Sequence, residues 1–76
     1  MQTFEAKIDG KVVSYPQSAT FIVEQRQNKK AYSLLAARDT ISEATGKYHK
    51  SLQQGMTIRL SAVHNGKVLP LIRRGA

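Results

Sequence analysis

The feature that most constrains this chain is a strict two-residue alternation followed closely by an Asn-Gly pair. The apolar residues of Met56–Ala62 occupy every second position. Successive side chains of a strand point to opposite faces of a sheet, so this pattern predicts a strand with one buried face. Asn65-Gly66 is the strongest short signal for a hairpin turn, and Val68–Ile72 follows as its second strand. Pro70 cannot donate to a strand ladder, which predicts an edge strand.

The N-terminal segment also alternates, but with a change of parity in its middle. Apolar residues fall on even positions up to Ile8 and on odd positions from Val13 to Tyr15. A bulge at a glycine produces such a change, so we prefer one long strand that bends at Gly10. A hairpin with an Asp9-Gly10 turn is the alternative.

Two further strands follow in the first half of the chain. A turn at Pro16–Ser18 leads to a strand over Ala19–Arg26, with Phe21 and Val23 on one face. A polar loop at residues 27–29 then precedes a strand over Lys30–Ala37. The run 34–37 could also be helical, but the tight loop before it favours a strand.

A single helix is predicted between the third strand in chain order, Lys30–Ala37, and the fourth, Met56–Ala62. Thr40-Ile41-Ser42-Glu43 has the form of a capping box, in which Thr and Glu side chains satisfy free amides at a helix start. The apolar side of the helix is given by spacings of three and four residues: Ile41, Ala44, Tyr48 and Leu52. Gly46 weakens this helix by roughly 1 kcal/mol, and Gln54-Gly55 is a suitable end.

The order of these elements predicts the fold class. Three strands, a helix and two strands, with a long glycine-containing first strand, is the order of the oligonucleotide/oligosaccharide-binding (OB) fold. We therefore expect a mainly β chain that forms a small five-stranded OB-type barrel, with one short helix between strands 3 and 4. The length of 76 residues allows one domain, so residues 1–76 are expected to form a single OB-like unit.

Two passages resemble known OB families. The stretch Leu52–Leu60 is similar to the corresponding passage of bacterial single-stranded-DNA-binding and primosomal-replication-protein-B proteins. The stretch Gly10–Asn28 resembles the opening strands of the initiation-factor-one type. The resemblance implies binding of single-stranded nucleic acid, with DNA favoured over RNA, and an accessory role in replication or in a mobile element. The chain departs from these families in its shortness, its lack of Trp and its lack of an acidic C-terminal tail.

Charge is the second reason to expect a nucleic-acid partner. The chain has 12 Lys and Arg against 5 Asp and Glu, a formal net charge of +7. A charge of this density on a small domain favours polyanionic partners. OB domains bind strands with cations along the phosphates and aromatic rings under the bases. We expect these binding residues: Tyr15, Arg26, Lys29, Lys30, Tyr32, Arg59, His64, Lys67, Arg73 and Arg74.

Some of these assignments have structural alternatives. The cations from Arg26 to Lys30 could form a solvated hairpin tip, and Arg73 and Arg74 could be a soluble tail. Tyr32 is the stacking candidate because it follows two lysines, but its parity with Leu34 also fits a core position. The chain has only five aromatic residues, so a long stacking platform is excluded. We therefore expect a modest affinity for single strands unless the protein forms a homo-oligomer.

Other functional classes have less support. The chain has no Cys, its two His are 15 residues apart, and its carboxylates are scattered, so we expect no metal, no cofactor and no catalytic activity. The main alternative is a small SH3-like barrel that acts as an adaptor or inhibitor of an acidic protein. We expect a cytoplasmic protein without membrane contact, because the N-terminus shows no basic start followed by an apolar run.

Overall fold

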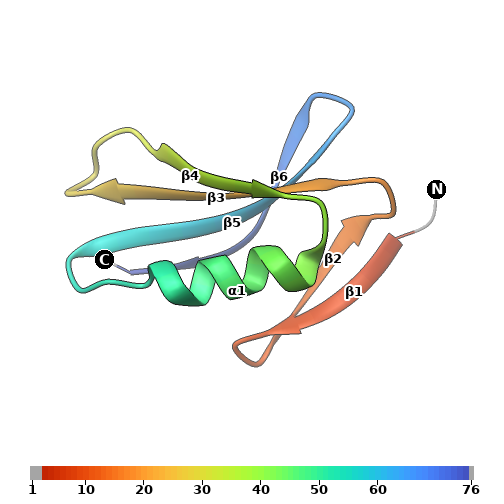
Figure 1. Cartoon of the computed structure of the whole chain (residues 1–76), viewed down its shortest axis with the longest axis horizontal. Helices are drawn as coiled ribbons and strands as arrows, with labels where there is room; N and C mark the ends of the chain where they lie inside the picture. Colours follow the sequence, from red (N-terminus) through yellow and green to blue (C-terminus); the bar gives the residue numbers. More distant parts are fainter. Residues whose placement is uncertain (1–2, 76) are drawn as a thin grey trace.

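The computed structural model describes residues 3–75. These residues form, in order, β1 Thr3–Ile8, β2 Lys11–Pro16, β3 Thr20–Gln27, β4 Ser33–Arg38, α1 Ile41–Ser51, β5 Met56–His64 and β6 Lys67–Arg74. β1 and β2 form a two-stranded antiparallel sheet, and the other strands form a second sheet in the order β4-β3-β5-β6 (Figure 1). Every pairing is antiparallel. The chain is therefore mainly β with one short helix, as predicted.

The preferred interpretation of the N-terminal segment is wrong. It is a hairpin and not one bent strand, because Ile8 pairs with Lys11 and Ala6 pairs with Val13. Asp9 and Gly10 form its turn with φ angles of 52° and 79°, as the alternative required. A two-residue turn places Ile8 opposite Lys11, so Ile8, Lys11, Val13 and Tyr15 lie on one face of the hairpin. The change of parity is thus a property of the hairpin and needs no bulge.

The second hairpin, between β5 and β6, is confirmed. Asn65 and Gly66 form its turn with φ angles of 51° and 76°. Glycine adopts such a positive φ without a steric cost. Within residues 3–75, β6 pairs only with β5, so Pro70 lies on an edge strand as predicted. β6 runs to Arg74. Arg73 and Arg74 are therefore strand residues, and their interpretation as a tail is wrong.

β4 contains an irregularity that decides where its side chains point. Val23 pairs with Ala36 but Glu24 pairs with Leu34, so Leu35 is an extra residue in β4. Leu35 packs against the core, whereas Leu34 is 63% exposed. The strand begins at Ser33 and not at Lys30 as predicted, because positive φ angles at Asn28 and Lys29 extend the preceding loop.

Helix α1 begins and packs largely as predicted. Thr40 is its N-cap, and the Glu43 amide donates to the Thr40 hydroxyl at 3.2 Å. The hydroxyl in turn donates to the Glu43 carboxylate at 2.9 Å. Ala44 and Tyr48 are fully buried. Gly46 is exposed, and a Cβ at this position would meet no atom of the described residues within 4 Å, so packing among them does not require this glycine.

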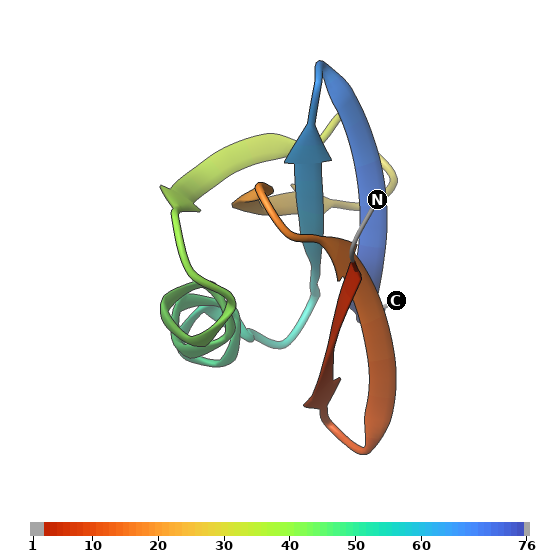
Figure 2. The same ribbon diagram turned by 90° about the vertical axis from the view of Figure 1, so that its right-hand side faces the viewer.

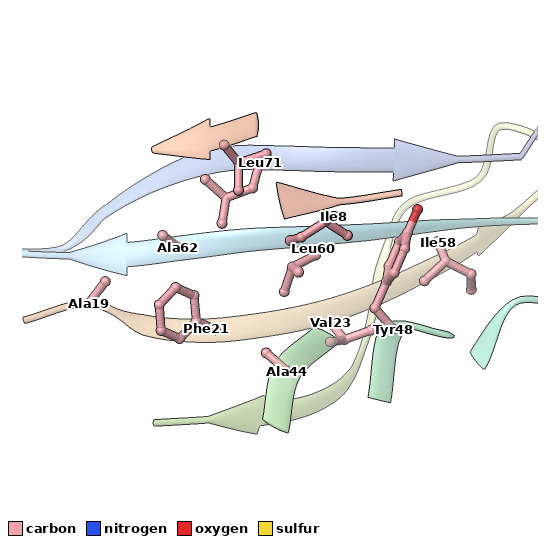
Figure 3. Packing of buried hydrophobic residues seen from close by; sticks show 11 residues of the cluster. Ile8, Ala19, Phe21, Val23, Ala44, Tyr48, Ile58, Leu60, Ala62 and Leu71 are labelled. Atoms are coloured by element: carbon pink, nitrogen blue, oxygen red, sulfur yellow. The ribbon is translucent and has the colours of Figure 1, made fainter. Parts of the chain in front are cut away.

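The core lies between the four-stranded sheet on one side and α1 with the β1–β2 hairpin on the other (Figure 2). Side chains from all of these elements converge there (Figure 3): Ile8, Val13, Ala19, Phe21, Val23, Ala44, Tyr48, Ile58, Leu60, Ala62 and Leu71. Neither sheet of residues 3–75 closes on itself, so a five-stranded barrel is not confirmed. Helix α1 spans 11 residues, and the described part of the chain has no helix long and apolar enough to cross a bilayer.

Candidate nucleic-acid interface

The candidate site lies on the face of the four-stranded sheet that points away from α1. Val23 and Leu60 pair across β3 and β5 and are fully buried in the core. Their neighbours Glu24 and Arg59 also pair with each other. Because side chains alternate along a strand, this second pair stands on the opposite face. The same alternation places Arg26 beside it.

Glu24 holds the Arg59 guanidinium in a fixed position. Arg59 Nε and Nη2 donate to the same carboxylate oxygen, Glu24 Oε1, at 3.1 and 2.7 Å. The Arg59 side chain is 27% exposed and that of Glu24 is 16% exposed. Partial burial reduces the screening of this pair, and charge-assisted hydrogen bonds are stronger than neutral ones. Arg59 is therefore positioned before any ligand arrives.

Tyr32 contacts two guanidinium groups. The Cζ atom of Arg59 lies 3.7 Å from the centroid of the Tyr32 ring, and that of Arg26 lies 4.8 Å from it. Both distances are within the range of cation–π attraction. Tyr32 Oη and Arg26 Nε are buried, and neither has a hydrogen-bond partner among residues 3–75. The three side chains form a compact cluster.

An open groove of about 520 Å³ runs along this cluster. Its walls come from β2, β3, β5, β6 and the residue preceding β4: Lys11, Arg26, Tyr32, Arg59, Pro70, Leu71, Ile72 and Arg73. Arg73 is the cross-strand partner of Arg59. Four cations, one aromatic ring and a floor of apolar side chains are a combination that suits phosphates and bases together.

The structure brings together four of the predicted site residues and leaves the other six outside this groove. Arg26, Tyr32, Arg59 and Arg73 line it. Lys29 and Lys30 are exposed in the loop between β3 and β4, which precedes Tyr32. His64 and Lys67 lie at the β5–β6 turn, where they line a separate pocket with Pro16.

Tyr15 and Arg74 have other contacts. The Tyr15 ring lies 6.0 Å from that of Phe4 and 5.1 Å from that of Phe21, measured between centroids. Tyr15 therefore packs the β1–β2 hairpin against the core. Arg74 Nη1 lies 3.7 Å from Asp9 Oδ2.

Two residues of the site were not predicted. Lys11 reaches the groove from β2, which the sequence pattern assigned to the same strand as β1. Glu24 was treated only as part of a strand. A usable signal was present in the sequence of β3, because Glu24 and Arg26 stand two residues apart. Charged groups at this spacing share one face of a sheet.

Asp9 and His49 form the nearest approach to a catalytic or metal-binding pair. His49 Nε2 lies 2.8 Å from Asp9 Oδ1, although the two residues are far apart in sequence. Both are at the surface, with the His49 side chain 46% exposed. Among residues 3–75, no group of three or more His, Asp or Glu side chains is placed to hold a metal ion.

Comparisons with known proteins give no relative from which a function could be transferred. No family model, curated protein or solved structure matches this chain.

Proposed function

We propose that this protein binds single-stranded nucleic acid without catalysis, through the groove that Tyr32 and its two arginines form. The observation that carries the proposal is the contact of Arg26 and Arg59 with one tyrosine ring inside a basic groove. Proteins that bind single strands combine these same elements, a positively charged groove and aromatic side chains on which bases stack.

The cluster offers a separate contact to each part of a nucleotide. Guanidinium planes and the tyrosine ring both provide flat surfaces on which a base stacks. Arg73 and Lys11 are exposed at the groove wall and provide charge for the phosphates. Because Glu24 already fixes Arg59, less side-chain freedom is lost when a ligand binds.

The proposal includes an OB-type barrel as the architecture that carries the groove. β2 lies beside β6 without pairing with it, and Lys11 of β2 lines the groove that β3 and β5 carry. A strand bound in the groove would therefore contact both sheets. The preference for DNA over RNA rests on the resemblance of Leu52–Leu60 to the primosomal type.

One observation favours the alternative of an acidic protein partner. Leu34 is 63% exposed and shares the outward face of β4 with the groove. A polypeptide would use this apolar area, whereas a phosphate backbone would not. The ratio of absorbance at 260 and 280 nm distinguishes the two, because a nucleic-acid-binding protein purified at low salt retains nucleic acid and raises the ratio.

The proposal is tested by the anisotropy of labelled oligonucleotides at two salt concentrations, with single-stranded DNA, single-stranded RNA and duplex DNA. We expect the single strands to bind more tightly, and affinity to fall as salt rises. Arg26→Gln should lower the slope of log K against log salt by about 0.7, the value for one contact to a single strand. Lys7→Gln removes the same charge from the exposed face of β1 and should change the slope less. Absence of binding to any oligonucleotide at low salt would refute the proposal.

A further inference from the structure

A second basic surface is formed by one side of α1 and by Arg38 at the end of β4. It is a shallow pocket of about 320 Å³ lined by Arg38, Glu43, Gly46, Lys47 and Lys50. Ala44 and Tyr48 are buried against the sheet. Glu43, Lys47 and Lys50 are separated by four and three residues, so they share the opposite side of the helix. We call this set of five residues the helix surface.

The cations of the helix surface have no acidic partner within the described residues. Among residues 3–75, none of Arg38, Lys47 and Lys50 forms an ion pair. Arg38 Nη1 donates to the carbonyl of Ala37 at 2.8 Å, which holds its guanidinium in place. By contrast, the neighbouring His49 is paired with Asp9. The helix surface therefore carries three cations without an ion-pair partner among residues 3–75, and one carboxylate, Glu43, which accepts a hydrogen bond from the Thr40 hydroxyl.

Gly46 is the second observation that indicates a partner at this surface. Glycine weakens the interior of a helix relative to alanine, yet the backbone of Gly46 is helical and a Cβ there would meet no atom of residues 3–75 within 4 Å. Within these residues, neither a turn nor close packing explains the glycine. Its exposed backbone lies among the three cations, where a missing side chain allows a phosphate backbone to approach closely.

The groove and the helix surface have no lining residue in common. The groove lies on the sheet face away from α1, whereas the helix surface combines one side of α1 with Arg38, which ends β4 and pairs with the core residue Phe21. Figure 2 shows α1 set below the sheet, with the core between them. A short strand bound in the groove therefore leaves the helix surface uncovered.

We propose that the helix surface binds the phosphate backbone of a second single strand, so that one molecule bridges two strands. This inference rests on the proposed function of the groove and adds a second site to it. A bridging protein holds two strands, or two parts of one strand, close together.

The test counts bound strands with oligothymidines of about eight nucleotides, a length within the range that one small domain covers. Native mass spectrometry should show two strands per molecule of the unmodified protein. It should show one for Lys47→Gln/Lys50→Gln and one for the matched groove variant Arg26→Gln/Arg73→Gln. Donor- and acceptor-labelled oligothymidines should show energy transfer only with the unmodified protein.

Substitution at Gly46 separates loss of binding from loss of structure. Gly46→Gln improves helix propensity and fills the pocket, so we expect Tm to rise by several degrees, about 3–7 °C, while the second strand is lost. Two strands on Lys47→Gln/Lys50→Gln, or a single strand on the unmodified protein, would overturn the bridging inference and leave the groove proposal standing. Failure of the unmodified protein to bind any strand would instead reject the groove proposal, and the bridging inference with it.

Discussion

The Cζ atom of Arg59 lies 3.7 Å from the centre of the Tyr32 ring, and the same guanidinium is held by Glu24 from the neighbouring strand. The ring and the cation come from segments more than 25 residues apart in sequence, so only the folded sheet creates the contact. This arrangement links the electrostatic part of the site to its aromatic part. The predictions below separate the two.

Tyr32→Ala should weaken binding to single strands by about 1–3 kcal/mol, the loss that follows removal of one stacking ring. Tyr32→Phe should bind nearly as well, because the ring remains and the Tyr32 hydroxyl has no hydrogen-bond partner among residues 3–75. Titration of a labelled oligothymidine gives both values. Equal affinities for the alanine and phenylalanine variants would mean that the ring does not stack on a base.

The pair of Glu24 and Arg59 should contribute to stability beyond what an exposed ion pair does. Both side chains are less than one third exposed, and two hydrogen bonds join them. A double-mutant cycle with Glu24→Gln and Arg59→Gln should give a coupling of about 1–2 kcal/mol in urea unfolding. The exposed pair of Asp9 and Arg74, 3.7 Å apart, is the internal control and should give less than about 1 kcal/mol. Similar couplings for the two pairs would show that Glu24 does not hold Arg59 as tightly as the distances indicate.

Tyr48 should make the fold sensitive to alkali. Burial raises the pKa of the Tyr48 hydroxyl above its ordinary value, the Asp9 carboxylate raises it further, and Arg74 opposes this. The unfolded chain then releases the proton at a lower pH than the folded one. The contribution of the protonated Tyr48 hydroxyl to the free energy of unfolding is fully present below the ordinary pKa of about 10. It is lost as pH rises through the folded-state pKa.

Tyr48→Phe tests this linkage. The buried hydroxyl of Tyr48 has no hydrogen-bond partner within residues 3–75. The phenylalanine variant should therefore be as stable as the unmodified protein at pH 7, or more stable. Urea unfolding measured from pH 8 to 11 should show a smaller loss of stability for the variant. Parallel pH profiles for the two proteins would show that the Tyr48 hydroxyl does not cause the loss of stability at alkaline pH.

The sequence predicts most of the strands because their information is local. The alternation over Met56–Ala62 and the Asn65-Gly66 turn each need only a few adjacent residues. The N-terminal hairpin was misjudged because its change of parity fits a bulge as well as a two-residue turn. Which of the two forms depends on whether Ile8 and Val13 reach one core, and that is decided by α1 and β5, far along the chain.

The site was harder to predict than the strands. Arg26, Tyr32 and Arg59 were named individually, but their meeting depends on the β3–β5 register and on the extra residue Leu35 in β4. Parity with Leu34 suggested that Tyr32 could belong to the core. Tyr32 and Leu34 do share one face, but it is the outward face of the sheet, because Leu34 is exposed. The hydrophobicity of Leu34 therefore does not indicate that Tyr32 belongs to the core.

Two glycine-to-alanine substitutions should have opposite effects on stability. At both Gly10 and Gly46 an added Cβ meets no atom of the part of the chain that the structure describes within 4 Å, so packing there does not distinguish the two positions. Gly10 has a φ of 79°, a conformation that costs an L-residue about 1–2 kcal/mol, whereas Gly46 is in a helix, where alanine is favoured by about 1 kcal/mol. Urea unfolding should therefore show Gly10→Ala to be destabilised and Gly46→Ala to be stabilised. A neutral Gly10→Ala would contradict the two-residue turn between β1 and β2, and a destabilised Gly46→Ala would mean that the helix needs its glycine for a reason within the fold.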